Sequence, residues 1–310
     1  MSTDRHVLVT GSSGFVARHS LAPLAARGFD VHAVARRPRP DDLVDAALTW
    51  HQADLLDSDA RHALLDAIAP THLLHAAWYL EPGRYTGSPA NLDWVAASID
   101  LVRRFQLGGG RRVVTVGSCF EYEHGRIPVL TETSPLRPAT VYGLAKQSLS
   151  TAMEALGRAT ELSSSWARLF YLYGPHEDRR RLIADITASL LEGREVATSE
   201  GRARRDYMFI ADAGDALAAL LESEVTGPVN VATGSAPPVR DLVSLVASAV
   251  GRADLVKFGA RPAPPNDPPE IRADITRLRD EVGWSALTPP KEGVARTVEW
   301  WRSQLALASA

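Results

Sequence analysis

The feature that most constrains the fold is a glycine-rich turn near the N-terminus. A short apolar, β-branched run, residues 6–10, leads into Gly11, and a helical pattern over residues 15–27 follows Gly14. Gly11 permits a tight turn, Gly14 lets the backbone approach a pyrophosphate, and the helix N-terminus supplies N–H groups and partial positive charge. The next small residue, Ala17, allows close packing of helix on strand. This pattern predicts a dinucleotide phosphate site between the first strand and the first helix.

Strand-like apolar runs and helical patterns alternate through the first half of the chain. Strands are predicted at residues 30–35, 48–51, 71–75, 112–117 and 164–170, and helices at 58–68, 89–107 and 139–159. Short connections between such units favour right-handed crossovers, and a near-continuous apolar run such as 112–117 is typical of a strand buried on both faces. The sequence therefore predicts an α/β fold, a Rossmann-type doubly wound parallel sheet.

The alternation becomes irregular after Gly174 and Pro175, which predicts a smaller C-terminal α+β domain that binds substrate. We expect a dinucleotide-binding domain at residues 1–172, to which residues 206–232 return, and a substrate-binding domain at 173–205 and 233–310. Further helices are predicted at 182–191, 213–221 and 291–307. The proline-rich segment 261–270 is expected to be a loop or hinge, because proline is excluded from helix interiors and central strands.

Composition and charge exclude several classes of function. A net charge of −3 gives the 310-residue chain no global positive field for nucleic acid or an anionic membrane. The single cysteine, Cys119, cannot form an internal disulfide, and the histidines show no zinc-ligand spacing with cysteines, so we expect no metal. No export signal and no apolar run of about 18 residues is present. We therefore expect a cytoplasmic protein without nucleic-acid or membrane partners.

The end of the second strand bears on the choice of cofactor. Where an acidic residue would accept the 2′-hydroxyl of the adenosine ribose, this chain has Arg36 and Arg37. Guanidinium groups favour NADP(H), because its 2′-phosphate accepts charge-assisted hydrogen bonds, and NAD is the other possibility. The alternative interpretation is a solvated basic turn.

Residues after the third and fourth strands complete the predicted cofactor site. Asp54 can accept a hydrogen bond from the adenine amino group, although Asp57 or the residue after it can simply cap the next helix. Ala76 and Ala77 would let the nicotinamide end lie against backbone, whereas His75 is interpreted as a core histidine. The predicted cofactor contacts are Gly11, Ser13, Gly14, Phe15, Val16, Arg36, Arg37, Asp54, Leu55, Ala76, Ala77, Tyr142 and Lys146.

A tyrosine and a lysine form the predicted catalytic group. Tyr142 and Lys146 lie four residues apart on one face of a predicted helix, so they can share one ligand. An adjacent ammonium is expected to lower the pKa of the phenol, which is otherwise near 10. Ser118 follows the fifth strand, at the strand ends where an open parallel sheet binds its ligand. We predict that Ser118 steadies a reacting oxygen, Tyr142 exchanges its proton, and Lys146 also holds the nicotinamide ribose.

Three motifs in this order resemble the extended short-chain dehydrogenase/reductase family over nearly the whole chain. They are TGSSGFVA at residues 10–17, Ser118, and YGLAK at residues 142–146. The family contains nucleotide-sugar epimerases, dehydratases and ketoreductases. Asn91 matches the position of the family's structural asparagine and is included with the catalytic group, and a helix cap is the equal alternative. The resemblance also implies a homodimer that pairs through residues 95–105 and 145–156.

The resemblance extends to the substrate side. Arg205 matches an arginine that meets the nucleotide diphosphate in the family, and Arg261 resembles a second one, since two guanidinium groups can hold a pyrophosphate. The alternative for Arg205 is an ion pair with Asp206 or another carboxylate. Tyr171 stands where many members have an asparagine that contacts the sugar.

The residues after Ser118 argue against dehydration, because Cys119 and Phe120 replace the acidic pair of the family's dehydratases. Cys119 is interpreted as a packing residue that lines the pocket. Trp78 can shape the sugar site or pack in the core. The predicted substrate contacts are Trp78, Cys119, Phe120, Tyr171, Arg205 and Arg261.

These observations lead to a prediction of NADPH-dependent reduction of a nucleotide-linked keto-sugar, specifically a dTDP-4-keto-6-deoxyhexose 4-ketoreductase. The alternative is an NAD-dependent nucleotide-sugar 4-epimerase, which uses the same side chains but retains its cofactor. Arg36 and Arg37 disfavour the epimerase, because they favour NADP(H) over NAD. An alternative of another class is a non-catalytic, NADP-binding regulatory protein, which the complete set of Ser118, Tyr142 and Lys146 disfavours.

Overall fold

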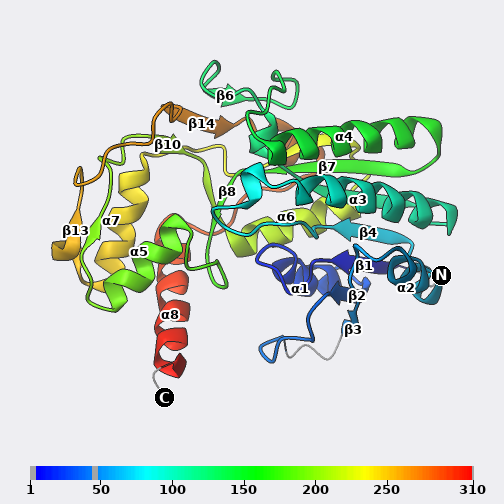
Figure 1. Cartoon of the computed structure of the whole chain (residues 1–310), viewed down its shortest axis with the longest axis horizontal. Helices are drawn as coiled ribbons and strands as arrows, with labels where there is room; N and C mark the ends of the chain where they lie inside the picture. The colour runs from blue at the N-terminus through cyan, green and yellow to red at the C-terminus, as the bar shows by residue number, and fades with distance from the viewer. Residues whose placement is uncertain (1–4, 44–47, 309–310) are drawn as a thin grey trace.

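The core of the protein, in a computed structural model that describes residues 5–43 and 48–308, is a seven-stranded parallel sheet (Figure 1). Its strands are β1 (His6–Thr10), β2 (Asp30–Ala35), β3 (Leu48–Gln52), β4 (His72–His75), β5 (Arg112–Ser118), β7 (Ser163–Leu169) and β12 (Gly227–Val231). The spatial order is β12-β7-β5-β4-β1-β2-β3. The direction of winding reverses between β1 and β4, and ligands of such sheets bind at the carboxyl ends of the strands beside this reversal.

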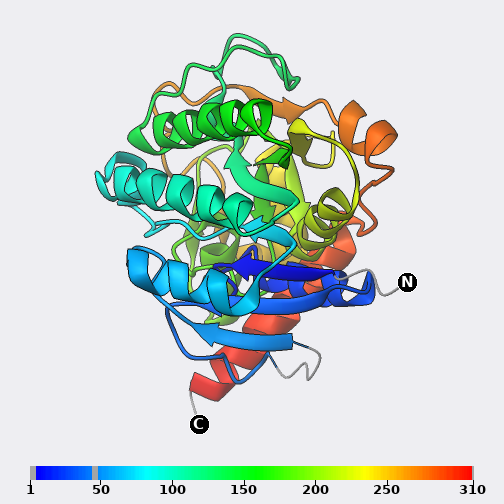
Figure 2. The same ribbon diagram turned by 90° about the vertical axis from the view of Figure 1, so that its right-hand side faces the viewer.

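Helices cover both faces of the sheet because its strands are apolar on both sides. Alternate residues of β1 divide between two clusters: Val7 and Val9 pack with α1 (Arg18–Ala26) and α6 (Ile210–Glu222). Leu8 packs on the other face. The helices of that face are α2 (Ser58–Ile68), α3 (Ala90–Leu107) and α4 (Val141–Ala159). The helices α3 and α4 lie side by side in both views (Figure 1, Figure 2).

A second group of helices packs at one end of the molecule, on the left of Figure 1. These are α5 (Leu182–Leu191), α7 (Val239–Val250) and α8 (Pro290–Ala308). Three small parallel sheets, in the orders β10-β14-β6, β11-β8 and β13-β9, complete the fold. Their strands are β6 (Val129–Leu130), β8 (Tyr171–Tyr173), β9 (Val196–Ala197), β10 (Arg204–Arg205), β11 (Tyr207–Phe209), β13 (Val256–Lys257) and β14 (Glu270–Ala273). Short 3-10 helices occupy Tyr85–Gly87, Cys119–Glu121 and Ala253–Leu255, and Arg277–Glu281 is a π-helix.

The structure confirms the α/β fold class and corrects several element bounds. The first helix begins at Arg18 rather than residue 15, because residues 11–17 form the glycine-rich turn and Ser12 donates its N–H to the Val34 carbonyl instead of a helix. A seventh strand, β12, joins the sheet from within 206–232. The proline-rich segment is a loop that ends where β14 begins at Glu270. The division into two domains stays a prediction.

Within the described ranges, none of the helices combines the length and the apolar character that crossing a bilayer requires.

Candidate active site

The glycine-rich turn closes on the end of β4. Gly11 has φ +73°, and a Cβ on it would lie 2.9 Å from the backbone N and Cα of Ala77. The Thr10 hydroxyl accepts the N–H groups of Ala76 and Ala77, both at 3.1 Å, which holds β1 and β4 together at this point. Gly14 donates its N–H to the Gly11 carbonyl at 2.8 Å. A cradle without room for a side chain fits the close approach of a dinucleotide to backbone.

A buried histidine supports the glycine cradle through hydrogen bonds. His75 is 2% exposed, with Nδ1 2.8 Å from the Thr10 hydroxyl and Nε2 2.8 Å from the Ser98 hydroxyl. Burial lowers the pKa of His75 to about 3, so the ring is neutral near pH 7. His75 is therefore the core histidine that the sequence indicated.

The other predicted cofactor residues lie around the same strand ends. Arg36 and Arg37 are exposed just after β2, and Asp54 follows β3 partly exposed, with its carboxylate accepting the Leu56 N–H at 3.0 Å. Leu55 is buried in the core instead of facing the turn. The cap of α2 is Asp57, which accepts N–H groups from the first turn. The remaining turn residues, Ser13, Phe15 and Val16, lie at the surface or are partly buried.

Ser118 and Tyr142 meet at the carboxyl end of β5. Both residues are buried, each with 7% exposure, and the Ser118 hydroxyl is close enough to Tyr142 to oppose the rise that burial causes in the pKa of the phenol. Tyr142 is in the first turn of α4. Thr140 caps this helix, because its hydroxyl accepts the Gly143 N–H. Gly143 makes this approach possible, since a Cβ there would lie 2.4 Å from the Phe120 carbonyl oxygen. The ring of Tyr85 packs edge-on against Tyr142, with centroids 5.0 Å apart.

Lys146 lies on the same helix but does not lower the pKa of Tyr142 as the sequence predicted. Its Nζ donates to the Val116 carbonyl at 2.8 Å and lies 3.6 Å from the centroid of the Trp78 ring. Burial lowers the pKa of Lys146 to about 7, and burial raises the pKa of Tyr142, a shift that the Ser118 hydrogen bond opposes. The expectation that Lys146 lowers the pKa of Tyr142 is therefore wrong, because desolvation disfavours the charged forms of both side chains.

Asn91 supports the lysine indirectly. It is fully buried in the first turn of α3, where its amide oxygen accepts from Trp78 Nε1 at 2.8 Å and its amide nitrogen donates to the Tyr85 and Ser88 carbonyls. The residue before α3 is Pro89, so the helix-cap alternative for Asn91 is wrong. Asn91 therefore fixes Trp78, whose ring face lies 3.6 Å from the Lys146 Nζ.

The predicted substrate residues are only partly brought together. Phe120 lies between Tyr142 and Tyr171, with ring centroids 6.3 Å from each, and Arg205 lies over Tyr171. Arg205 is 5% exposed, and its ion-pair partner is Asp267 in the proline-rich loop. These contacts form a row of side chains from Tyr142 through Phe120 and Tyr171 to the Arg205 guanidinium.

Arg261 is exposed in the proline-rich loop, and its backbone N–H donates to the Thr198 carbonyl. Its role as a second phosphate ligand stays a prediction. Of the partners considered for Arg205, Asp206 is not the one that pairs with it: its buried carboxylate accepts N–H groups from Thr233, Gly234 and Ala273. The other carboxylate that the alternative allowed is Asp267. Cys119 is buried, and burial raises the pKa of its thiol, so it is a neutral packing group.

Comparison with known proteins decides the family. Residues 7–232 match the model of the NAD dependent epimerase/dehydratase family. The chain belongs to this family. It is 28% identical to UDP-glucose 4-epimerase of Mycolicibacterium smegmatis over 96% of this chain and 98% of that protein. It also superposes on the Thermus thermophilus UDP-glucose 4-epimerase complex with NAD (25% identity, TM-score 0.84, 96% and 99% covered). MoeE5 in complex with UDP-glucuronic acid and NAD is similar as well (28% identity, TM-score 0.82, 96% and 99% covered).

These findings confirm the extended short-chain dehydrogenase/reductase family and an NAD(P)-dependent oxidoreductase type of enzyme. They favour the 4-epimerase alternative over the ketoreductase that the sequence predicted first.

In this member of the epimerase/dehydratase family, a buried carboxylate also contacts the backbone of Ser118, and the sequence did not predict it. Glu121 is fully buried and accepts from the Ser118 N–H at 2.7 Å, from Trp166 Nε1 at 3.0 Å and from Arg168 Nε at 2.9 Å. Arg168 continues the network to the Tyr122 hydroxyl. The side chain of Glu121 thus fixes the backbone of the serine from the far side of β5. The sequence signal that could have indicated this contact is an acidic residue three positions after the serine.

Proposed function

We propose that this protein is an NAD-dependent 4-epimerase of a UDP-sugar. The observation that carries the proposal is the 28% identity with a UDP-glucose 4-epimerase over nearly the full length of both chains. The burial of Ser118 and Tyr142 and the tight glycine turn support it. Epimerisation needs an oxidation and a reduction at the same carbon, so one set of groups must serve both directions.

The side chains of the site supply the proton chemistry. An oxidised nicotinamide held in the cradle would supply the hydride chemistry at the sugar C4, and its positive charge would favour the phenolate of Tyr142. As that phenolate, Tyr142 would take the proton of the C4 hydroxyl at its Oη and later return it, and the Ser118 hydroxyl would hold the same oxygen through both steps. Lys146, already buried beside Tyr142 on α4, would hold the ribose hydroxyls of the cofactor.

The nucleotide end of the substrate is assigned to Arg205. Its guanidinium is nine-tenths buried at the end of the aromatic surface formed by Phe120 and Tyr171, which suits a pyrophosphate joined to a sugar. Tyr171, in the place of the family's common asparagine, offers the sugar a ring face and a hydroxyl.

Two measurements test this proposal. Protein purified without added cofactor is denatured, and the released nucleotide is identified by chromatography; we expect NAD in near-stoichiometric amount. Proton NMR then follows UDP-glucose for conversion to UDP-galactose without added cofactor. Tyr142→Phe should lower kcat by about 10²–10⁴-fold while retaining NAD. Unchanged turnover in Tyr142→Phe would exclude this chemistry.

A second candidate is NADPH-dependent reduction of a nucleotide-linked 4-keto-sugar, favoured by one observation. Arg36 and Arg37 are exposed after β2, where a 2′-phosphate would lie. This candidate predicts no retained NAD, loss of NADPH absorbance with a dTDP-4-keto-6-deoxyhexose, and weaker NADPH binding in an Arg36→Ala, Arg37→Ala double variant. Cofactor binding without turnover of either substrate class would instead favour the non-catalytic alternative.

A further inference from the structure

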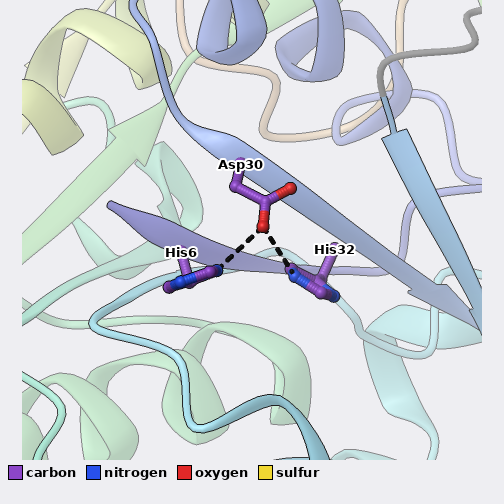
Figure 3. Close-up of side chains that lie close together, drawn as sticks. All are labelled: His6, Asp30 and His32. Carbon is purple, nitrogen blue, oxygen red and sulfur yellow. Dashed lines mark hydrogen bonds and ion pairs between the residues drawn. The ribbon is translucent and has the colours of Figure 1, made fainter. Parts of the chain in front are cut away.

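Three potential metal ligands gather at the amino ends of β1 and β2, on the edge of the sheet opposite the glycine cradle. His6 pairs in register with Asp30, and His32 follows two residues later on the same face of β2. One ligand atom from each residue lies within 4.8 Å of the other two. Figure 3 shows both imidazole rings directed at a single carboxylate oxygen of Asp30. The nitrogen-to-oxygen separations are 2.8 Å for His6 Nδ1 and 3.3 Å for His32 Nε2.

We propose that His6, Asp30 and His32 bind a divalent transition-metal ion of the Zn²⁺ type. Two imidazoles and one carboxylate are a ligand set that zinc accepts, with a fourth position for water. Bonds of about 2.0–2.1 Å place neighbouring ligand atoms of a tetrahedral site roughly 3.3–3.4 Å apart. The separation between His32 Nε2 and the Asp30 oxygen already has this value, and that of His6 Nδ1 is about half an ångström shorter. The two imidazole nitrogens lie within 4.8 Å of each other and would have to come to this spacing when the ion binds.

A third histidine, His51, orients one of the ligands. His32 Nδ1 lies 3.0 Å from Nε2 of His51 on β3, and the two rings stack with centroids 5.2 Å apart. Because Nδ1 is engaged there, Nε2 is the His32 atom that faces Asp30. Protein metal sites commonly fix a histidine ligand by such a hydrogen bond from its other nitrogen.

The site is accessible, and its place separates it from the proposed reaction. The side chains of His6, Asp30 and His32 are 33%, 52% and 16% exposed, so an ion can enter from solution. The cradle lies at the carboxyl ends of the strands, and this cluster lies at the amino ends of β1 and β2. A metal here would cross-link the two strands and would take no part in hydride transfer.

The test is calorimetric titration of tag-free, chelator-treated full-length protein with ZnCl₂. We expect one site per chain, at least tenfold weaker binding in both His32→Ala and Asp30→Asn, and a rise in Tm with ZnCl₂ that these variants lose. The matched control is His62→Ala, because His62 also pairs with a surface carboxylate, that of Asp100, at 3.0 Å. This control should bind like the wild type.

Replacement by Co²⁺ gives a second readout, because tetrahedral coordination produces intense visible absorption that His32→Ala should abolish. The proposal is overturned if the wild type binds neither ion, which would leave a hydrogen-bonded triad only. It is equally overturned if His32→Ala and Asp30→Asn bind as tightly as the wild type. Epimerase activity should be unchanged by ZnCl₂ or chelator, so failure here leaves the proposed function intact.

Discussion

The carboxylate of Glu121 has three hydrogen-bond donors around it and no exposed surface. Glu121→Gln would leave the Arg168 guanidinium facing a neutral amide in a buried site. We expect the free energy of unfolding to fall by about 3–5 kcal/mol, the usual cost of breaking a buried ion pair. We also expect kcat to fall more than KM rises, because the Ser118 backbone loses its anchor. Urea denaturation and steady-state kinetics measure both effects.

Glu299→Gln is the control for this prediction. Its carboxylate pairs with Arg302 at 2.9 Å, and the two side chains are 68% and 53% exposed. Such surface pairs contribute little, so stability and kcat should change by less than about 1 kcal/mol and twofold. Equal effects in the two variants would show that the buried network has no special role.

The buried amine of Lys146 gives a pH dependence that can be isolated. In the unfolded chain its pKa is near 10.5, and in the cofactor-free fold burial lowers this pKa to about 7. The unfolded state therefore binds more protons between these values, so stability from this group rises with pH across that window. In urea melts of protein from which the cofactor has been removed, the unfolding free energy of the wild type should rise relative to Lys146→Met by up to about 1.4 kcal/mol per pH unit between pH 7 and 9. A constant difference over this range would contradict the neutral buried amine.

At the scale of elements, the β1–α1 turn depends on glycine for a specific reason. A side chain at Gly11 meets the Ala77 backbone at 2.9 Å and must adopt φ +73°. Gly11→Ala should therefore lower stability and abolish retention of the cofactor, measured as nucleotide released per chain on denaturation.

Gly28→Ala provides the comparison, since Gly28 has φ +78° but nothing within 4 Å of its added Cβ. It should cost only backbone strain of about 1 kcal/mol and keep its cofactor. Cofactor loss in both variants would mean that strain, and not the contact with β4, controls binding.

Elements with a strong repeating pattern could be predicted from the sequence, and short ones could not. The strand β5 carries three valines among its seven residues and is buried throughout, so its pattern was visible. Strands such as β10 and β13 have two residues each and exist only because a partner strand lies beside them. A two-residue strand has no period to detect.

At the scale of the whole molecule, the helix pair α3 and α4 exposes apolar side chains. Ile99 on α3 is 37% exposed and Leu144 on α4 is 52% exposed. We predict that these helices form a homodimer interface, because such residues on adjacent helices suit a two-fold helical contact. An Ile99→Glu, Leu144→Glu double variant should be monomeric by light scattering. Leu287→Glu, at a leucine that is 78% exposed elsewhere, should leave the assembly unchanged. A monomeric wild type would contradict this interface.

The sequence by itself determined the fold class and the place of the glycine-rich turn, and it predicted Ser118, Tyr142 and Lys146 as the catalytic group. Each rests on a local pattern: the spacing of apolar residues, of glycines, or of two residues one helical turn apart. The choice between reductase and epimerase did not follow, because both reactions use these same side chains.

Only the tertiary structure decided how those residues are charged and which distant residues join them. Burial holds Lys146 with a lowered pKa and Tyr142 with a raised one, against the expected tuning. Packing of separate segments gives Arg205 its partner Asp267 and brings His6 to His32 across two strands. Desolvation and contacts between residues far apart in the chain depend on how the segments pack, and no spacing along the sequence encodes that directly.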